Sequence, residues 1–466
     1  MKIAIVGTGY VGLVTGTCLA EIGHDIVCFE KDQRKIAALE RGVLPIFEPG
    51  LENLVSRNVA ADRLRFARGL EILDASFEAI FIAVGTPQSA IDHSADLTAL
   101  FASAAQIAVH AKVPLTIITK STVPAGTGDR IERILRTERP DLKFVVVSNP
   151  EFLREGCAVH DFMNPDRIVV GSNDPFGWET VQRIYQPLLN GGTPFCTTSR
   201  RSAEVIKYAS NAFLATKIAF ANEMADLCEA VGAEIDDVAT GMGLDRRIGR
   251  EFLRCGPGYG GSCFPKDTEA LLVTAHQNGV NLRLVESTIA ANDARKRTMA
   301  RRIAAALNGE VAGRPIALLG LTFKADTDDM RQSPSLPLVA ALIDAGASVR
   351  VFDPQAMEQA RLYLDGVRFT DSAYACAEGV DAVVLVTDWN EFLGLDYSRI
   401  ARSMRGNVFI DLRNAIPEET LRQAGLAVHR LGRRHHDMAA FRPVAPVPTF
   451  DRIGSPPNHR ANGHAY

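Results

Sequence analysis

Two blocks of short apolar runs, each alternating with helix-like stretches, constrain the fold of this 466-residue chain more than any other feature. The runs of the first block lie at 2–6, 25–29, 79–84, 115–120 and 144–148, and those of the second at 315–319, 348–352, 382–386 and 408–411. Strands that alternate with helices form parallel sheets covered on both faces. The sequence therefore predicts an α/β protein with two Rossmann-like parallel-sheet domains.

A helical segment separates the two blocks. Residues 203–231 and 268–278 repeat apolar side chains at helical spacing and contain no strand pattern. Beyond about residue 433, prolines, glycines and polar residues succeed one another without periodicity, which is typical of disorder. We expect a dinucleotide-binding Rossmann domain at 1–200, a central helical domain at 201–300, an α/β domain at 301–434 and a disordered tail at 435–466.

Composition narrows the possible partners. The net charge is −4, and the basic residues are scattered rather than clustered, so no nucleic acid or membrane surface is expected to bind. The 8 cysteines show neither metal-ligand spacing nor a disulfide framework, and the adjacent His435 and His436 are too isolated to indicate a metal site. The chain starts with a strand-like run and contains no run of about 18 apolar residues, so we expect a cytoplasmic protein. The cysteine and histidine spacing predicts no metal site.

A glycine-rich turn comes after the first predicted strand, with the sequence Gly7-Thr8-Gly9-Tyr10-Val11-Gly12. Gly7 permits a tight turn, Gly9 lets the backbone approach a pyrophosphate, and Gly12 lets the next helix pack on the strand. An ordinary strand-to-helix turn is the alternative. Because strand, turn, helix and second strand occur in register, the segment predicts a dinucleotide site.

Glu30 ends the second predicted strand, about 20 residues after the glycine turn. A carboxylate at this position accepts hydrogen bonds from a ribose 2′-hydroxyl and repels a 2′-phosphate, which favours NAD over NADP. Lys31 and Arg34 lie close enough in sequence to keep NADP as an alternative.

Two further loops, 83–87 with Thr86 and 121–127 with Thr122, come after predicted parallel strands. Open α/β sheets bind ligands at the carboxyl ends of their strands, so we expect both loops to line the nicotinamide side of the site. Each threonine has an alternative role as a helix cap.

Two glutamates and a lysine–asparagine pair are candidate site residues, the glutamates for base and substrate-orienting roles. Glu151 and Glu155 are four residues apart, and if their segment is a helical turn they share one face; charged residues on a solvated turn are the alternative. Lys207 and Asn211 have the same spacing within an apolar helical pattern and should also face one direction. A lysine that extends to solvent is the alternative there.

Cys263 lies in a segment, 256–267, that is rich in glycine and continues into Lys266 and Asp267. Such a loop lets a ligand approach the backbone, and a thiol there is a candidate covalent nucleophile. Its thiolate needs a cation, either Lys266 or another one nearby. Most buried free cysteines are inert, which is our interpretation of Cys18, Cys28 and Cys228.

Together the segments 7–12, 121–127, 149–171, 256–267 and 320–335 make the chain similar to the nucleotide-sugar 6-dehydrogenases, the UDP-glucose/GDP-mannose dehydrogenase family. The resemblance covers about residues 1 to 430. It implies an NAD-dependent, four-electron oxidation of the sugar C6 alcohol to a carboxylate. In this reaction Cys263 forms a thiohemiacetal and then a thioester, which water cleaves.

The resemblance also implies site residues. Those that carry the chemistry are Cys263, Lys207, Asp267, Thr122 and Glu151. Those that contact the cofactor are Gly7, Gly9, Tyr10, Val11, Gly12, Glu30, Lys35, Thr86, Thr122, Glu155, Lys266 and Arg331. Those that contact the nucleotide sugar are Glu151, Phe152, Leu153, Glu155, Lys207, Asn211, Arg247, Phe252, Tyr259, Gly260, Lys324 and Arg413. Arg247 resembles an arginine that reaches a partner's site, which implies a homodimer.

Within the family, segments 165–171, 245–249 and 387–389 look like the branch that uses UDP-glucose. Dehydrogenases of GDP-mannose or of a UDP-N-acetylhexosamine are the first alternative. A non-catalytic nucleotide-sugar-binding protein is the second, although it would have no reason to keep the five catalytic residues together. Glu30 departs from the more usual aspartate at the ribose position but keeps the carboxylate.

Overall fold

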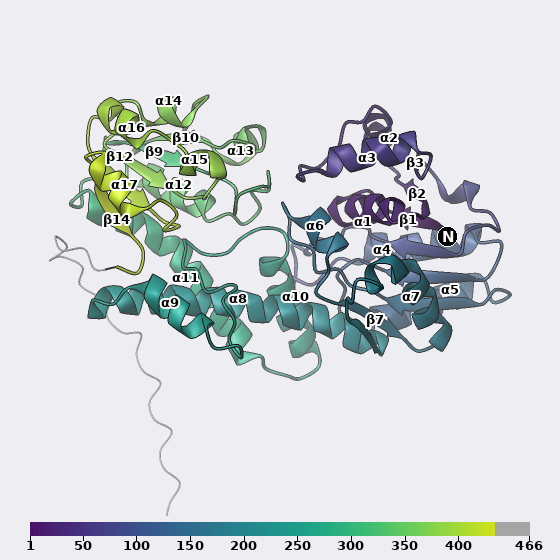
Figure 1. Ribbon diagram of the computed structural model, residues 1–466. Helices are drawn as coiled ribbons and strands as arrows, with labels where there is room; N and C mark the ends of the chain where they lie inside the picture. Colours follow the sequence, from purple (N-terminus) through teal and green to yellow (C-terminus); the bar gives the residue numbers. More distant parts are fainter. Residues whose placement is uncertain (434–466) are drawn as a thin grey trace, which may run out of the picture.

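The computed structural model describes residues 1–433. They form two α/β parts, each with its own sheet, and a layer of long helices that runs beneath both (Figure 1). The α/β class and the central helical region predicted from the sequence are confirmed. The predicted tail at 435–466, with His435 and His436, lies outside the described residues.

The first sheet has eight strands in the order β3-β2-β1-β4-β5-β6-β7-β8. The strands are β1 (Lys2–Val6), β2 (Asp25–Phe29), β3 (Leu64–Ala67), β4 (Ala79–Ile82), β5 (Leu115–Thr119), β6 (Phe144–Ser148), β7 (Ile168–Ser172) and β8 (Phe195–Thr198). Neighbours pair in parallel except β6 and β7, which are antiparallel. The sequence pattern indicated β1, β2, β4, β5 and β6, whose residues are largely buried.

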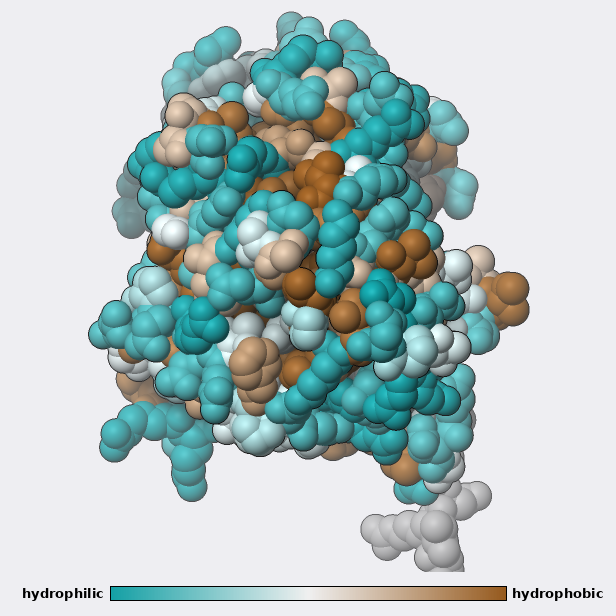
Figure 2. All heavy atoms as spheres, turned by 90° about the vertical axis from the view of Figure 1, so that its right-hand side faces the viewer, coloured by the Kyte–Doolittle hydropathy of each residue, from teal (hydrophilic) through white to brown (hydrophobic). Residues whose placement is uncertain are grey.

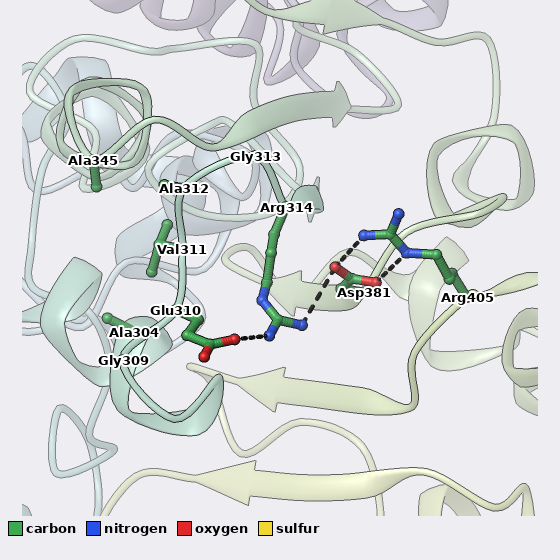
Figure 3. A pocket seen from close by; sticks show the side chains of 10 residues that line it. All are labelled: Ala304, Gly309, Glu310, Val311, Ala312, Gly313, Arg314, Ala345, Asp381 and Arg405. Carbon is green, nitrogen blue, oxygen red and sulfur yellow. Dashed lines mark hydrogen bonds and ion pairs between the residues drawn. The ribbon is translucent and has the colours of Figure 1, made fainter.

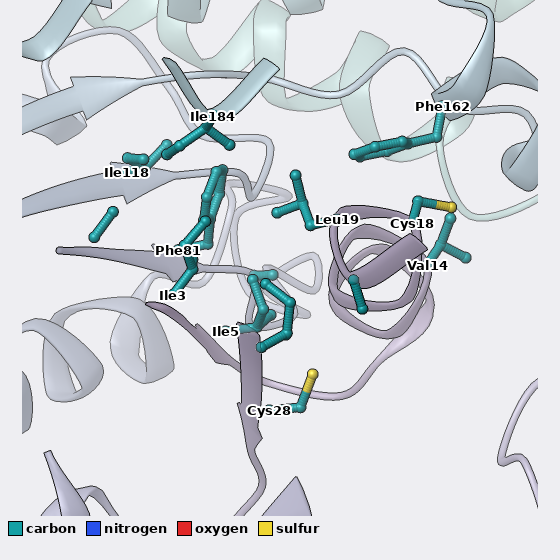
Figure 4. Packing of buried hydrophobic residues seen from close by; sticks show 14 of the residues in the cluster. Ile3, Ile5, Val14, Cys18, Leu19, Cys28, Phe81, Ile118, Phe162 and Ile184 are labelled. Atoms are coloured by element: carbon teal, nitrogen blue, oxygen red, sulfur yellow. The ribbon is translucent and has the colours of Figure 1, made fainter. Parts of the chain in front are cut away.

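Helices cover both faces of this sheet. They are α1 (Tyr10–Glu21), α2 (Gln33–Glu40), α3 (Leu51–Ala60), α4 (Thr98–His110), α5 (Thr127–Glu138), α6 (Ala158–Met163) and α7 (Pro175–Leu189), with a short 3-10 turn at Leu70–Ile72. On one face Ile3, Ile5 and Phe81 pack against Leu19 of α1 and Ile184 of α7 (Figure 4). Apolar side chains project from both faces of the central strands. These strands therefore appear in the sequence as continuous apolar runs.

Four helices connect the two sheets: α8 (Arg200–Val231), α9 (Ile235–Gly243), α10 (Phe264–Gln277) and α11 (Arg283–Ala306). The side chain of Ser199 accepts a hydrogen bond from the Ser202 amide at the start of α8, and Gly232, with φ of 78°, ends it in the left-handed region that glycine tolerates. None of the helices in residues 1–433 is long and apolar enough to cross a membrane.

The second sheet has six strands, all parallel, in the order β11-β10-β9-β12-β13-β14. They are β9 (Pro315–Leu319), β10 (Ser348–Phe352), β11 (Arg368–Phe369), β12 (Ala382–Leu385), β13 (Val408–Asp411) and β14 (Ala427–Arg430). Their helices are α12 (Ser335–Asp344), α13 (Met357–Tyr363), α14 (Ala373–Ala377), α15 (Asn390–Leu393), α16 (Tyr397–Ser403) and α17 (Glu418–Gln423). The sequence pattern indicated four of these strands and not the edge strands β11 and β14.

The face of the molecule beside the first sheet is mainly hydrophilic, with hydrophobic residues in small groups between charged ones (Figure 2). This mixture agrees with the scattered basic and acidic residues of the sequence.

Candidate active site

A cavity of about 670 Å³ lies where loops of the first sheet, the start of α10 and the segment after β9 meet. Of the residues predicted from the sequence, those that line it are Gly9, Tyr10, Val11, Thr86, Thr122, Glu151, Leu153, Glu155, Cys263, Lys266 and Arg331. Segments separated by more than 300 residues thus converge on one hollow.

The glycine turn has the geometry that a pyrophosphate requires. Gly7 has φ of +99°, in the left-handed region. A Cβ on Gly12 would lie 1.9 Å from the Gly7 carbonyl oxygen, whereas a Cβ on Gly9 would meet nothing within 4 Å. Gly12 therefore serves the packing of α1, and Gly9 leaves open space in front of the helix. No side chain caps the first turn of α1, so its amide groups remain available to an anion.

Glu30 comes directly after β2 and points back to the glycine turn. Its carboxylate accepts hydrogen bonds from the Thr8 hydroxyl at 2.7 Å and from the Lys31 amide at 2.8 Å. Burial opposes its charge, but the hydrogen bonds from Thr8 and Asp32, together with the positive charge of Lys35, hold its pKa below the usual value. A fixed, ionised carboxylate beside an open helix terminus fits the ribose and pyrophosphate of NAD.

The two threonine loops meet each other. The Thr86 hydroxyl donates a hydrogen bond to the Thr122 carbonyl oxygen at 2.9 Å, and both residues line the cavity. Neither threonine caps a helix, since α4 begins at Thr98 and α5 at Thr127.

Glu151 forms a buried ion pair with Lys207, with 3.0 Å between carboxylate oxygen and ammonium nitrogen. The expectation that Glu151 and Glu155 share a helical turn is wrong, because residues 149–154 are not helical. The Glu151 carboxylate accepts the Leu153 amide at 2.5 Å. Such a local bond competes with the helical hydrogen-bond ladder. Both glutamates nevertheless reach the cavity.

Lys207 and Asn211 do share one face of α8, as their spacing predicted. Asn211 donates to Asp267 at 2.6 Å, while Lys207 binds Glu151. Asp267 is almost fully buried in the first turn of α10. One face of α8 therefore contacts both the loop after β6 and the cysteine segment.

Cys263 immediately precedes α10, at its N-cap position. Burial and the nearby Glu151 raise the pKa of its thiol to about 11, and the charge of Lys207 opposes this rise. Lys266 instead binds Asp267 at 2.5 Å. The sequence left either Lys266 or another cation as the group that stabilises the Cys263 thiolate. The cation whose charge lowers the pKa of this thiol is Lys207.

The glycines before Cys263 pack against protein rather than facing open space. A Cβ on Gly260 would lie 2.4 Å from the Gln332 carbonyl oxygen. Gly261 has φ of +82°, and its Cβ would lie 2.7 Å from the Phe323 ring. Glycine is needed at these two positions so that the cysteine segment can touch the segment after β9, and the approach of a ligand to this backbone stays a prediction.

Glu155 lies between the cysteine and the second sheet. It accepts a hydrogen bond from the Ser262 hydroxyl at 2.7 Å, and the Arg331 guanidinium lies 3.7 Å from the same carboxylate. Burial and, after it, the negative charge of Asp329 raise the pKa of Glu155 to about 7.

Five further predicted residues, which do not line the cavity, have these contacts. Phe152 stacks under the Arg167 guanidinium at 3.7 Å, and Phe252 and Tyr259 each lie 6.1 Å from the Phe264 ring. Burial lowers the pKa of Lys324. Arg413 donates to the carbonyl oxygens of Val386 and Phe323, each at 2.8 Å. Of these residues, Lys324 and Arg413 belong to the part of the chain that contains the second sheet.

Arg247 is not brought to this cavity within one chain. Its side chain is 89% exposed and pairs with Asp245 at 2.6 Å. Its predicted contact with the nucleotide sugar stays a prediction.

Several residues near the cavity were not predicted. Lys120, which is fully buried, donates to Asn149 at 3.1 Å and to Tyr185 at 3.2 Å. Glu48 accepts the amides of Gly156 and Ala158, each at 2.7 Å. Lys120 directly precedes the Ser121-Thr122 motif, which was a usable signal, whereas no local pattern connects Glu48 to a loop 108 residues away.

A second cavity, of about 620 Å³, lies at the other end of the second sheet. Arg314 and Arg405 both pair with Asp381 there, at 3.5 Å and 2.6 Å, and Glu310 pairs with Arg314 (Figure 3). None of the residues predicted for the site lines this hollow, and the charges drawn in it neutralise one another.

Comparison with known proteins adds the family. The models of the UDP-glucose/GDP-mannose dehydrogenase family match in order: the NAD binding domain at residues 1–189, the central domain at 201–294 and the UDP binding domain at 317–418. UDP-glucose 6-dehydrogenase of Rhizobium meliloti is 51% identical over 93% of this chain and 100% of its own length. The enzyme of the same name from Bacillus subtilis is 44% identical, with 93% of each chain covered.

Solved structures agree. A UDP-glucose dehydrogenase from Pyrobaculum islandicum matches with a TM-score of 0.85 and 36% identity, covering 93% of this chain and 98% of its own. A UDP-D-ManNAc dehydrogenase from Pyrococcus horikoshii matches with a TM-score of 0.81 and 28% identity, covering 93% and 99%. With three family domains in order around one cavity, the chain belongs to the UDP-glucose/GDP-mannose dehydrogenase family.

Proposed function

We propose that this protein oxidises the C6 alcohol of UDP-glucose to a carboxylate, using NAD twice and Cys263 as covalent nucleophile. The observation that supports this function is that the glycine turn, Glu151 and Cys263 line one cavity, with Lys207 paired to Glu151 behind its wall. NAD, when bound at the glycine turn and Glu30, supplies the hydride acceptor. We also propose domain limits near residues 200 and 300, between the last strand of one sheet and the first of the next.

The proposed roles derive from the contacts. The Lys207 ammonium stabilises negative charge on the C6 oxygen, because it is paired with Glu151, which lines the cavity. Asp267, fixed by Asn211 and Lys266, and the Thr122 hydroxyl position the water that cleaves the thioester. A covalent link on Cys263 keeps the aldehyde in the site between the two oxidations. A free thiol is required for this step, which supports a reducing compartment such as the cytoplasm.

The border of the cavity provides for the nucleotide. Lys324 and Arg413 lie on the side of the second sheet and supply positive charge to a diphosphate. Phe252 and Tyr259 offer ring surfaces beside the cysteine segment. UDP-glucose is preferred to GDP-mannose or a UDP-N-acetylhexosamine because the relatives with 51% and 44% identity bear that substrate in their names, whereas the UDP-D-ManNAc enzyme is 28% identical.

The test is the ratio of NADH formed to sugar consumed with limiting UDP-glucose, with GDP-mannose and UDP-N-acetylmannosamine in parallel. Two NADH per UDP-glucose is the expected result. Two NADH with another sugar only would assign the sister activity. Binding without NADH from any sugar would favour the non-catalytic alternative.

We further propose a homodimer formed along α8. Phe213, Phe220 and Leu227 recur every seven residues on this helix and are 67%, 43% and 51% exposed. Apolar side chains at this spacing form a seam that another helix covers. Arg247, exposed in the segment after α9, would then reach the partner's cavity.

Light scattering tests the dimer. Phe213→Glu combined with Phe220→Glu should halve the molar mass, because two charges would be buried without partners. Ile91→Glu, at a position 94% exposed in a loop of the first sheet, is the control that should leave the mass unchanged. A double variant of undiminished mass would exclude this face as the interface.

A further inference from the structure

Ser262 lies between the candidate nucleophile and a carboxylate. Its hydroxyl oxygen is 3.5 Å from the Cys263 sulfur and 2.7 Å from the Glu155 carboxylate, to which it donates. We propose that Ser262 is a catalytic residue that relays the proton of the Cys263 thiol to Glu155 when the sulfur attacks the C6 aldehyde. The relay rests on the proposed covalent role of Cys263.

In the contacts from Cys263 to Ser262 and from Ser262 to Glu155, the donor and the acceptor of each hydrogen bond can be assigned. A serine hydroxyl carries one hydrogen, and Glu155 receives it. The hydroxyl oxygen therefore has lone pairs left to accept the thiol hydrogen. Among residues 1–433, Ser262 is the one hydrogen-bond partner that the Cys263 sulfur has. The thiol thus has one direct exit for its proton.

Atoms and electrons balance in this step. The S–H bond breaks as its proton passes to the Ser262 oxygen, and the serine's own proton passes to Glu155. The sulfur electron pair forms the C–S bond, and the π electrons of the aldehyde move to its oxygen, giving the alkoxide of the thiohemiacetal. That alkoxide collapses to the thioester as a hydride leaves to NAD, the oxidant of the proposed function. Afterwards Ser262 donates to sulfur and accepts from Glu155.

Besides Glu155, the charged groups that face the thiol are Glu151, Lys207, Asp267 and Arg331. Glu151 is paired with the Lys207 ammonium, and Asp267 accepts from both Asn211 and Lys266. Both carboxylates are thus already bound by these partners, and Ser262 donates its hydrogen bond to Glu155 instead.

Glu155 differs from the other two carboxylates. The charged groups that face it are Asp329, Arg331 and Lys324, with hydroxyls from Ser262 and Thr327. Its burial and the charge of Asp329 raise its pKa to about 7. It is therefore partly ionised at neutral pH, and it is closer in basicity to a thiolate than an ordinary carboxylate is.

The first test measures thiol reactivity without any sugar. Iodoacetamide is small and uncharged, and modification of the Cys263 peptide is monitored by mass spectrometry from pH 6 to 10, because Cys157 and Cys196 are also exposed. Wild-type protein should show an inflection near pH 7 from Glu155. Ser262→Ala should lose it and react at least about tenfold more slowly at pH 8. Ser262→Thr, which keeps the hydroxyl, should restore the rate.

The Glu155→Gln variant distinguishes a proton relay from a purely electrostatic effect, because the two predict opposite changes in the alkylation rate of Cys263. The Glu155 charge helps to raise the pKa of Cys263, so its removal alone would speed alkylation. The relay predicts slower alkylation, because the proton acceptor is gone. Faster alkylation of Glu155→Gln, or a Ser262→Ala protein with the wild-type profile, would overturn the proposal. This arm also decides the matter should Ser262→Ala fail to fold.

Two controls accompany these variants. Thr327→Val removes a hydroxyl 3.4 Å from the other Glu155 oxygen and should leave the inflection in place. Ser103→Ala removes an exposed hydroxyl that bonds only to its own helix and should change nothing. Turnover is measured separately: an unchanged alkylation result with no oxidation of UDP-glucose would refute the proposed function and leave the relay intact.

Discussion

The two sheets share one strand order and differ in the segments that leave their first strands. β3-β2-β1-β4-β5-β6 and β11-β10-β9-β12-β13-β14 are the same arrangement, and the first sheet adds β7 and β8 at its edge. After β1 a glycine turn leads directly into α1, whereas after β9 an irregular segment runs to α12 at Ser335. One sheet therefore presents a helix N-terminus to the cavity, and the other presents side chains.

The carboxylates after the second strands show the same divergence. Glu30 comes after β2 and is half-buried beside open space. Asp353 comes after β10 at the matching position but is fully buried. It accepts the Leu321 amide at 2.7 Å and the Trp389 ring N–H at 3.1 Å. The same position is the predicted ribose contact in one sheet and holds the backbone of the segment after β9 in the other. Strand order sets where a site lies, and loop chemistry decides what it binds.

The proposed nucleophile, Cys263, belongs to the helical region between the two sheets. We expect its substitution to have the largest effect on activity. Cys263→Ala should lower acid formation by at least about a thousandfold, because the proposed thioester cannot form without the thiol. NADH release with UDP-glucose measures the activity, and circular dichroism with thermal unfolding verifies the fold. Cys196→Ala, at an exposed thiol of β8, is the matched control. A fully active Cys263→Ala protein would end the covalent mechanism.

The contrast between the two carboxylates predicts a loss of stability at the second sheet. Asp353→Ala should lower the free energy of unfolding by about 4 kcal/mol, because several buried N–H donors lose their acceptor. Urea denaturation measures this change. Glu30→Ala, where water replaces the carboxylate, should cost about 1 kcal/mol or less in the same assay. Equal losses in the two variants would contradict the distinction.

The residue after β5 is the buried Lys120, whereas the residue after β13 is the buried Leu412. Burial lowers the pKa of Lys120 to about 8; Glu151 opposes this shift and Lys207 adds to it. Above that pH the folded protein holds a neutral amine while the unfolded chain stays protonated, so stability rises with pH. Between pH 8 and 9.5 the gain should be about 2 kcal/mol.

Lys120→Leu, which copies the second sheet, should abolish this gain. Urea denaturation of both proteins at the two pH values gives the difference, and common titrations cancel in the comparison. If the variant gained as much as wild type, the rise would have another source.

The smallest effect is expected at the ribose position. Glu30→Ala should weaken NAD binding about tenfold, or 1.4 kcal/mol, through loss of hydrogen bonds to a charged acceptor. Titration calorimetry with NAD measures it, and NADP serves as the comparison ligand. Unchanged NAD affinity would remove Glu30 from the cofactor site.

Local patterns were sufficient where short-range geometry decides the outcome. The glycine turn was predicted because Gly7 and Gly12 answer to steric limits within one strand–turn–helix unit. Lys207 and Asn211 were placed on one face because helical spacing determines it. The helical turn expected for Glu151 and Glu155 was wrong. The Leu153 amide donates to the Glu151 side chain instead of to a backbone carbonyl oxygen of a helix.

Other parts of the site depend on residues distant in the sequence. The fit of Gly260 against Gln332 and the contact of Ser262 with Glu155 join segments that periodicity cannot relate. The choice of Lys207 over Lys266 as the cation for Cys263 is of the same kind. Edge strand β11 was missed because it has only two residues, and β14 because its sequence, Ala-Val-His-Arg, contains no apolar run.

The sequence by itself determined the α/β class, the helical region between two sheets, the glycine turn and the candidate nucleophile, since each derives from local sterics, periodicity or chemical type. Only the tertiary structure decided which charges meet: Glu151 with Lys207, Asn211 with Asp267, and Ser262 with Glu155. The physical reason is that burial and Coulomb energy depend on distance in space, and those distances exist only after the sheets and α8 have packed.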